Sequence, residues 1–170
     1  IYKRYGPLVI FDDASALFDK RDKIGVIGRN GAGKSTLCKV LLGFEEVDSG
    51  QVRTSSQLRL SYLEQRSPFE PDETVMAFLQ RQSGREEWEC GKLAGRFELK
   101  GELLERPATS LPGGFQTRVK LAGMLLGDPN FLVLDEPTNY LDLRTLILLE
   151  RFLRDFAGGF LIVSHDREFL

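Results

Sequence analysis

A nine-residue segment, GRNGAGKST at positions 28–36, constrains the fold of this chain more than any other feature of the sequence. It follows the apolar run IGVIG (24–28) and leads into LCKVLLG, a helical pattern that ends at Gly43. A strand, a glycine-rich loop and a helix in this order match the phosphate-binding pattern G-x-x-x-x-G-K-[ST]. The alternative is a glycine-rich turn that binds nothing. We reject it because every fixed position of the pattern carries the required residue.

We therefore expect this segment, called the phosphate loop below, to bind the phosphates of a nucleotide, ATP by default, together with Mg²⁺. Its glycines allow successive backbone amides to point at phosphate oxygens. Lys34 can reach the outer phosphates as a mobile point charge, and the hydroxyl of Ser35 can ligate Mg²⁺. The expected nucleotide-binding residues are Gly28, Arg29, Asn30, Gly31, Ala32, Gly33, Lys34, Ser35 and Thr36.

Two further apolar runs, FLVLD (131–135) and FLIVS (160–164), have the composition of strands that are buried on both faces, as does IGVIG. Between them lies LRTLILLERFLRDF, a helical pattern with Asp142 as a candidate N-cap and Gly158 as a stop. Strand, helix and strand in this order predict an α/β fold with a mostly parallel sheet. The apolar positions expected on the helix are Leu143, Leu146, Ile147, Phe152, Leu153 and Phe156.

Polar residues follow the second and third of these strands, where the carboxyl ends of parallel strands form a ligand site. Asp135 can belong to the Mg²⁺ shell, while Glu136 polarises a water for attack on the γ-phosphate. An Asp-Glu pair after a strand is more often a solvated turn, but the phosphate loop argues against that reading here. His165, the only histidine, follows the third strand and is interpreted as a γ-phosphate contact. A structural hydrogen bond is its alternative role.

Two residues are candidates on position alone. Gln65 ends the run LRLSYLEQ, and its neutral amide can contact both Mg²⁺ and the attacking water. Tyr5 precedes the phosphate loop, and its ring can stack on a base. Tyr2 competes with it for that role, and a tyrosine on the sheet surface without a ligand is an equal reading.

The segment from about residue 66 to 110 contains several prolines and no convincing strand. We interpret it as a small helical insert, which together with the helix after LPGGFQTR (111–118) forms a helical subdomain at 66–127. Gly113 and Gly114 open that helix, and free amides at a helix start favour an anion. A simple helix-entry turn is the alternative.

The 23 basic and 25 acidic side chains give a net charge of -2, which argues against non-specific binding to nucleic acid or to an anionic membrane surface. Cys38 and Cys90 lack metal-ligand spacing and are too few for a disulfide framework, so we expect a reducing, cytoplasmic location. We see no export leader and no membrane-spanning run, and we expect no direct membrane insertion. Residues 1–170 begin without Met, and we expect them to form a single domain that is truncated at both ends.

In order and spacing, these motifs resemble those of an ATP-binding cassette (ABC) ATPase domain over nearly the whole chain. Tyr5 matches the aromatic loop, 28–36 the Walker A loop, Gln65 the glutamine loop, LPGGFQ the signature, FLVLDE the Walker B strand, NYLD (139–142) the loop after it, and His165 the switch histidine. The resemblance implies a P-loop NTPase fold and Mg²⁺-dependent ATP hydrolysis. It implies catalytic roles for Glu136, His165, Gln65 and Lys34 and metal ligation by Ser35, Gln65 and Asp135.

The resemblance also implies a partner. Two such cassettes face each other head to tail, and the signature of one closes over the ATP of the other. The residues expected to meet the partner's ATP are Leu111, Pro112, Gly113, Gly114 and Gln116, with Asn139 and Asp142 in the dimer loop. Pro112 departs from the family's usual Ser, because it has neither a hydroxyl nor an N–H. It also restricts Leu111 to extended conformations. We expect it to weaken this closure without affecting the chain's own phosphate loop.

Three segments, GGFQTRV, PTNYLD and SHDREFL, resemble the ABC-F subfamily, although Tyr140 replaces the commoner His. ABC-F proteins carry two cassettes on one chain, have no membrane domain and generally act on ribosomes. The sequence leaves open the alternative of an ATPase subunit of a membrane transporter, and also a nucleotide-gated module with negligible turnover. For the isolated 170 residues we expect weak or absent ATPase activity.

Overall fold

The computed structural model describes residues 1–63 and 67–165. Contacts within the chain divide the described residues into two compact units. One, the sheet unit, contains residues 1–62, 130–137 and 157–165. The other, the helical unit, contains residues 63, 67–129 and 138–156. The predicted subdomain at 66–127 remains a prediction, and the helical unit also takes in the helix that follows residue 142.

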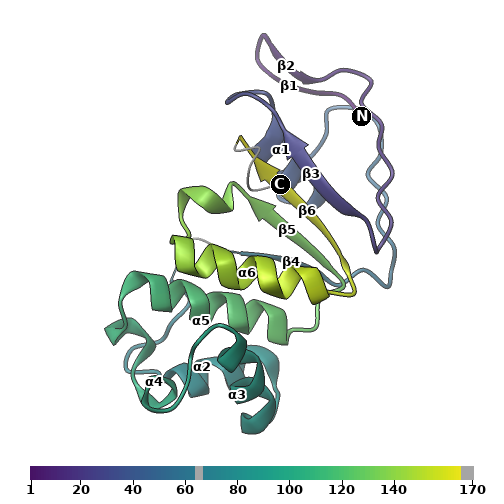
Figure 1. The fold of residues 1–170 in the computed structure, drawn as a ribbon. Helices are drawn as coiled ribbons and strands as arrows, with labels where there is room; N and C mark the ends of the chain where they lie inside the picture. Colours follow the sequence, from purple (N-terminus) through teal and green to yellow (C-terminus); the bar gives the residue numbers. More distant parts are fainter. Residues whose placement is uncertain (64–66, 166–170) are drawn as a thin grey trace. The chain divides into compact units, whose positions relative to one another are not determined.

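The sheet unit is built on four parallel strands in the order β3-β6-β5-β4, which lie side by side in Figure 1. The strands are β3 (Lys23–Ile27), β4 (Leu60–Tyr62), β5 (Phe131–Asp135) and β6 (Gly159–Ser164). A separate antiparallel hairpin is formed by β1 (Lys3–Tyr5) and β2 (Leu8–Phe11). The α/β class and the parallel sheet predicted from the three apolar runs are thus confirmed.

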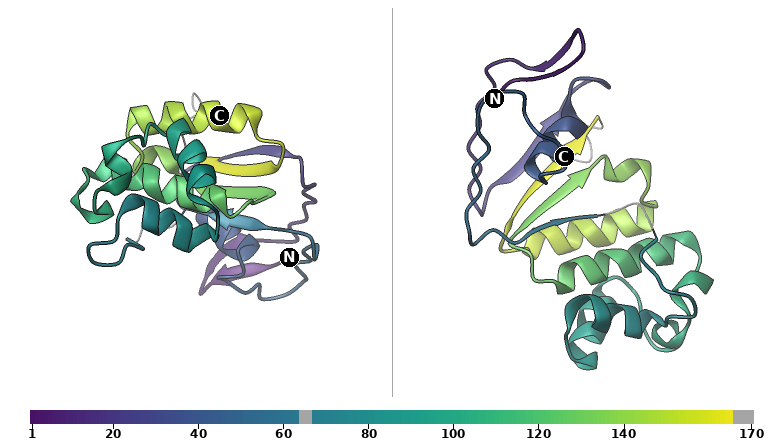
Figure 2. Two further views of the ribbon diagram at one scale, coloured as in Figure 1. Left: turned by 90° about the horizontal axis from the view of Figure 1, so that it is seen from below. Right: turned by 180° about the vertical axis from the view of Figure 1, so that it is seen from behind.

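The core of the sheet unit lies between the sheet and α1 (Lys34–Leu41), which follows the phosphate loop (Figure 2). Its buried members are Cys38, Phe131, Val133, Leu161 and Val163. Burial of each large apolar side chain stabilises the fold by roughly 1.5–3 kcal/mol. Burial, with a smaller contribution from the carboxylate of Asp135, raises the pKa of the Cys38 thiol to about 12. Cys38 is therefore a neutral packing group.

The expectation that all three apolar strands are buried on both faces is correct for β5 and wrong for β3. Residues 131–134 of β5 are buried, because β5 has a strand on each side. In β3, by contrast, exposed and half-buried residues alternate, and Ile27 is 51% exposed. The reason is position, since β3 is at the edge of the four-stranded sheet and pairs only with β6.

The helical unit contains no strand among its described residues, in keeping with the sequence pattern. Its helices are α2 (Val75–Ser83), α3 (Glu87–Arg96), α4 (Glu102–Glu105), α5 (Gly113–Leu126) and α6 (Leu143–Asp155). Phe78 of α2 packs on α5 at Gly123, where an added Cβ would lie only 2.9 Å from the Phe78 ring. The side chain of Thr74 caps α2 by accepting a hydrogen bond from the N–H of Ala77.

The helix predicted between the last two strands is α6, and its predicted cap is confirmed. Asp142 is the N-cap residue, and its side chain accepts a hydrogen bond from the N–H of Thr145. The predicted apolar face is only partly correct, because Leu143 is 73% exposed. The buried residues of α6 are Thr145, Leu148, Leu149, Phe152 and Leu153.

Across the described part of the chain, no helix combines the length and the apolar character needed to span a bilayer.

Candidate nucleotide site

The phosphate loop turns sharply between β3 and α1, and two of its glycines have positive φ angles, 81° at Gly31 and 93° at Gly33. Gly33 is also the N-cap residue of α1. A Cβ at Gly33 would lie 2.5 Å from Cγ2 of Ile10, which belongs to the β1–β2 hairpin. Only glycine satisfies both the backbone angle and this close contact. The loop conformation is therefore set jointly by its own glycines and by β2.

Lys34 is the first residue of α1 and is buried, with 8% of its surface exposed. Its Nζ donates hydrogen bonds to the carbonyl oxygens of Gly28 (2.7 Å) and Arg29 (3.0 Å). The same ammonium group lies 3.5 Å from Oε1 of Glu136. A buried cation held between the loop and a carboxylate is in position to bind a further anion.

Ser35 of α1 and Asp135 at the end of β5 bring together two oxygen atoms that can bind a metal ion. The Oγ of Ser35 donates to Oδ1 of Asp135 over 3.2 Å. Oxygen is the ligand atom that Mg²⁺ prefers, and one or two protein ligands suffice when phosphates and water supply the others. The described residues hold no cluster of three or more His, Cys, Asp or Glu side chains suited to a metal. This donor set fits Mg²⁺ that is bound together with a nucleotide.

Glu136 follows β5 in the left-handed backbone region, with φ at 47°. Its Oε2 accepts hydrogen bonds from the backbone N–H of His165 (3.2 Å) and lies 2.8 Å from His165 Nδ1. Burial raises the pKa of the Glu136 carboxyl, but the hydrogen bonds from His165 and the charge of Lys34 outweigh it, and the net pKa is lowered. The group is therefore an ionised carboxylate at neutral pH, as a general base must be.

The structure thus brings Lys34, Ser35, Asp135, Glu136 and His165 together at the carboxyl edge of the sheet, although their roles remain predictions. In the rest of the phosphate loop, Arg29, Asn30, Gly31 and Ala32 are exposed, and Gly28, Gly33 and Thr36 are half-buried.

Two further sequence candidates are Tyr5 and Gln65. Tyr5 is 43% exposed at the end of β1, where the Nζ of Lys3 lies 5.0 Å from its ring centroid. Exposure leaves its ring accessible for stacking, but it equally fits the surface tyrosine that was the alternative reading. Gln65 lies outside the described residues.

The signature segment, residues 111–116, leads into α5 of the helical unit. Leu111 is 4% exposed and belongs to the core, and its angles (φ −79°, ψ 151°) are extended. The extended conformation predicted for Leu111 is therefore confirmed. Pro112 is the N-cap residue of α5, and no side chain caps this helix. Gln116 turns inward, because its Nε2 donates to the carbonyls of Leu111 (2.8 Å) and Thr109 (3.2 Å).

The two signature glycines differ in their surroundings. Gly113 is exposed, and a Cβ there would meet nothing within 4 Å. At Gly114 an added Cβ would overlap Oδ2 of Asp142. The structure therefore brings Asp142 of the predicted dimer loop onto the signature helix of the same chain. Asn139, the other predicted loop residue, is exposed.

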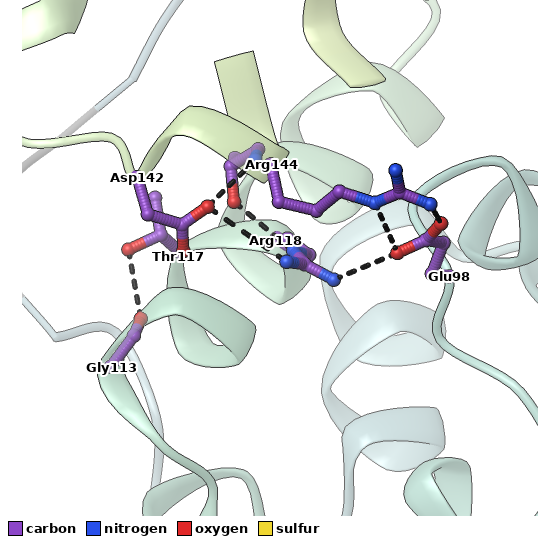
Figure 3. A network of polar contacts seen from close by, with 7 residues as sticks. Glu98, Gly113, Thr117, Arg118, Asp142 and Arg144 are labelled. Atoms are coloured by element: carbon purple, nitrogen blue, oxygen red, sulfur yellow. Dashed lines mark hydrogen bonds and ion pairs between the residues drawn. The ribbon is translucent and has the colours of Figure 1, made fainter. Parts of the chain in front are cut away.

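Sequence reasoning missed the polar group that surrounds Asp142, drawn in Figure 3. Arg118 of α5 is 7% exposed and contacts both Thr145 of α6 and Glu98 after α3. The sequence did hold a signal. Phe115, Val119 and Ala122 define one side of α5, and Arg118 lies among them at helical spacing. A charge at such a position indicates a buried ion pair.

Comparison with known proteins identifies the family. The family model described as "ABC transporter" matches residues 11–139. The chain therefore belongs to the ABC transporter family, and it is an ABC-type ATPase domain, as the motifs predicted.

Relatives of sub-family F are among its matches. The chain is 41% identical over 165 residues to ATP-binding cassette sub-family F member 3 of Pongo abelii, covering 95% of this chain and 23% of that protein. It is 40% identical over 177 residues to the ATP-binding protein Uup of Caulobacter vibrioides, covering 100% of this chain and 29% of that protein. The chain spans about a quarter of the length of these relatives.

Solved structures confirm the predicted P-loop NTPase fold. An ABC transporter in an inward-facing conformation superposes with a TM-score of 0.73 at 23% identity, covering 97% of this chain and 71% of that chain. A chain in the complex of archaeal ribosomal stalk protein aP1 with archaeal ribosome recycling factor aABCE1 superposes with a TM-score of 0.68 at 30% identity. That match covers 86% of this chain and 29% of the other.

Proposed function

We propose that this domain binds and hydrolyses Mg²⁺-ATP as one of two cassettes that close head to tail around nucleotide. The observation that carries the proposal is the convergence of a buried loop lysine, two oxygen donors, an ionised glutamate and a histidine on the edge of one sheet. This is the set of groups that phosphoryl transfer from ATP to water requires.

In the proposed reaction each side chain has a distinct task. Lys34 leaves its loop carbonyls and its contact with Glu136 to bind the outer phosphates of ATP. Glu136 then accepts a proton from the water that attacks the γ-phosphorus, the bond from that phosphorus to the β-phosphate oxygen breaks, and ADP leaves. His165 orients the carboxylate and contacts the γ-phosphate. Ser35 and Asp135 would hold Mg²⁺, which when bound neutralises charge on the phosphates. The predicted contribution of Gln65 to the metal and the water belongs to the same proposal.

The partner in this proposal is a second cassette, in tandem on the natural chain or on another one. The exposed Gly113 with the uncapped N-terminus of α5 offers backbone amides to the γ-phosphate of the partner's ATP. Leu111 and Gln116 serve by shaping the turn before the helix. Asn139 and Asp142 would meet the partner beside it.

For the cellular role we propose a cytoplasmic, ABC-F-like protein acting on ribosomes. Support comes from the sub-family F relative and from a structural neighbour whose title names a ribosome recycling factor. A transporter ATPase subunit is the second candidate, and the fold match to an ABC transporter is compatible with it.

Sedimentation of the natural full-length protein through a sucrose cushion, alone, with purified ribosomes or with membrane vesicles, tests the cellular role. We expect ATP to increase the fraction that pellets with ribosomes, because closure around ATP creates the binding-competent form. ADP serves as the matched control. Pelleting with membranes and not with ribosomes, in either nucleotide, would assign the protein to the transporter class instead.

A further inference from the structure

Arg118 of α5 is a buried charge that contacts α6, the N-cap residue of α6 and the segment after α3 (Figure 3). Its Nε donates to Oγ1 of Thr145 in α6 over 3.1 Å. Its other nitrogens lie 3.3 Å from Oε2 of Glu98 and 3.8 Å from Oδ1 of Asp142. An arginine whose side chain is only 8% exposed needs such partners to offset the desolvation of its charge. These contacts fix the orientation of its planar group.

Glu98 is the carboxylate that both arginines of this group contact. It follows α3 with a positive φ of 61° and accepts hydrogen bonds from both Arg118 of α5 and Arg144 of α6. In Figure 3 the two guanidinium groups reach the same carboxylate from different helices. The hydrogen bond from Arg144 is the largest cause that lowers the pKa of Glu98, which keeps it ionised at neutral pH. Glu98 therefore ties the start of α6 to the middle of α5.

Asp142 is held at the other end of the same group. Its Oδ1 accepts a hydrogen bond of 2.7 Å from the N–H of Thr145, so the carboxylate cannot turn without uncapping α6. Its Oδ2 occupies the space where residue 114 would carry a Cβ. The absence of a side chain at Gly114 thus allows the dimer loop to lie against the first turn of α5. In that turn the hydroxyl of Thr117 donates a hydrogen bond to the carbonyl oxygen of Gly113.

We infer that Arg118 is a positioning residue which, through Glu98, Thr145 and Asp142, holds the dimer loop against the signature helix before any partner arrives. The two segments then meet the partner cassette as one preassembled surface, and closure does not have to order them separately. Gly114 leaves room for the chain's own Asp142, whereas Gly113 stays accessible to the partner. This inference rests on the proposed function.

Glu98→Gln in the natural full-length protein tests the inference. The variant keeps the side-chain shape but removes the charge that pairs with Arg118 and Arg144. We expect faster amide hydrogen exchange at residues 139–146 and 113–117. ATP retained in the closed state, measured by filter binding in a Glu136→Gln background, should fall about tenfold or more. The affinity of the phosphate loop for ATP, measured by nucleotide titration, should not change.

Two further variants make the result specific. Gly114→Ala displaces Asp142 directly, so it should reproduce both effects, and combining it with Glu98→Gln should add less than the sum. Arg96→Met is the matched control. Arg96 also links α3 to α6, through an exposed ion pair with Asp155 (3.1 Å), but lies outside the group around Asp142. It should leave exchange at 139–146 and the retained ATP as in the parent.

The outcomes separate this inference from the proposed function. If the parent protein closes around ATP and Glu98→Gln closes equally well, Arg118 does not position the surface and the inference is wrong. A parallel loss of loop affinity and of global stability in Glu98→Gln would also contradict it, because a purely structural ion pair behaves in that way. If the parent itself retains no ATP, the head-to-tail mechanism fails and the inference fails with it.

Discussion

Replacing Glu136 by Gln should lower ATP turnover at this site by about 10²–10⁴-fold, the range that a general base contributes, while ATP remains bound. Gln has the same shape, and its amide oxygen can still accept from the N–H of His165, but it cannot take a proton from water. The full-length protein should therefore accumulate as a closed, ATP-bound form. Phosphate release gives the rate, and chromatography of the retained nucleotide gives its identity.

The matched control for this substitution is Glu150→Gln. Glu150 is exposed on α6 and pairs with Arg154, so the same chemical change there should leave turnover unaltered. A Glu136→Gln protein that releases phosphate as fast as the parent would remove Glu136 from the mechanism. If the parent turns over no ATP and Glu136→Gln leaves its ATP retention unchanged, the domain is a nucleotide-gated module without hydrolysis.

The second large effect is expected from Pro112→Ser, as a gain. Pro112 already has the backbone angles of a helix N-cap (φ −55°, ψ 150°), which Ser adopts readily, so no rearrangement is needed. The new hydroxyl can donate to the γ-phosphate of the partner's ATP. A hydrogen bond to a charged group contributes about 1.5–3 kcal/mol, which corresponds to roughly 10- to 150-fold in the closure equilibrium. Retained ATP and the mass of the closed form in ultracentrifugation would report the change.

Pro112→Ala separates the hydroxyl from the backbone in that experiment. It restores the N–H and releases Leu111 as Ser does, but it donates no hydrogen bond from its side chain. A melting curve for each variant is also needed, because a Ser at this position can cap α5 and raise stability by about 0.5–2 kcal/mol without contacting a partner. Equal closure by the Ser and Ala variants would show that the missing hydroxyl does not limit this signature.

Much of the sheet unit could be predicted because its sequence signals are local. The runs at 24–28, 131–135 and 160–164 lie within one residue of β3, β5 and β6. The contact of Glu136 with His165 follows from the adjacent parallel strands β5 and β6 ending at one edge, and Asp135 meets Ser35, which follows β3, at the same edge. The three-residue β4 could not be predicted, since its pairing depends on β5, far away in sequence. The two strands are also joined just before they begin, where the side-chain oxygen of Asn130 accepts a hydrogen bond of 2.8 Å from the backbone N–H of Arg59.

The helical unit shows where local patterns are insufficient. In α6, Leu146, Ile147, Leu148 and Leu149 are all apolar, so the sequence does not define which side faces the core. The structure buries Leu148 and Leu149, and Leu146 and Ile147 are only half-buried. Likewise, the different surroundings of Gly113 and Gly114 depend on Asp142, which approaches from another element. Identical residues side by side acquire different roles only through tertiary contacts.

The central claim is that the phosphate loop binds the triphosphate of ATP, and Lys34→Ala tests it most directly. Calorimetric titration with Mg²⁺-ATP should show an affinity about 10- to 150-fold lower than that of the parent, because a charge-assisted contact to the outer phosphates is lost. Lys39→Ala, an exposed lysine on the same helix, should bind as the parent does. Circular dichroism must show both variants folded, since Lys34 is buried. A folded Lys34→Ala protein that binds ATP as tightly as the parent would contradict the account.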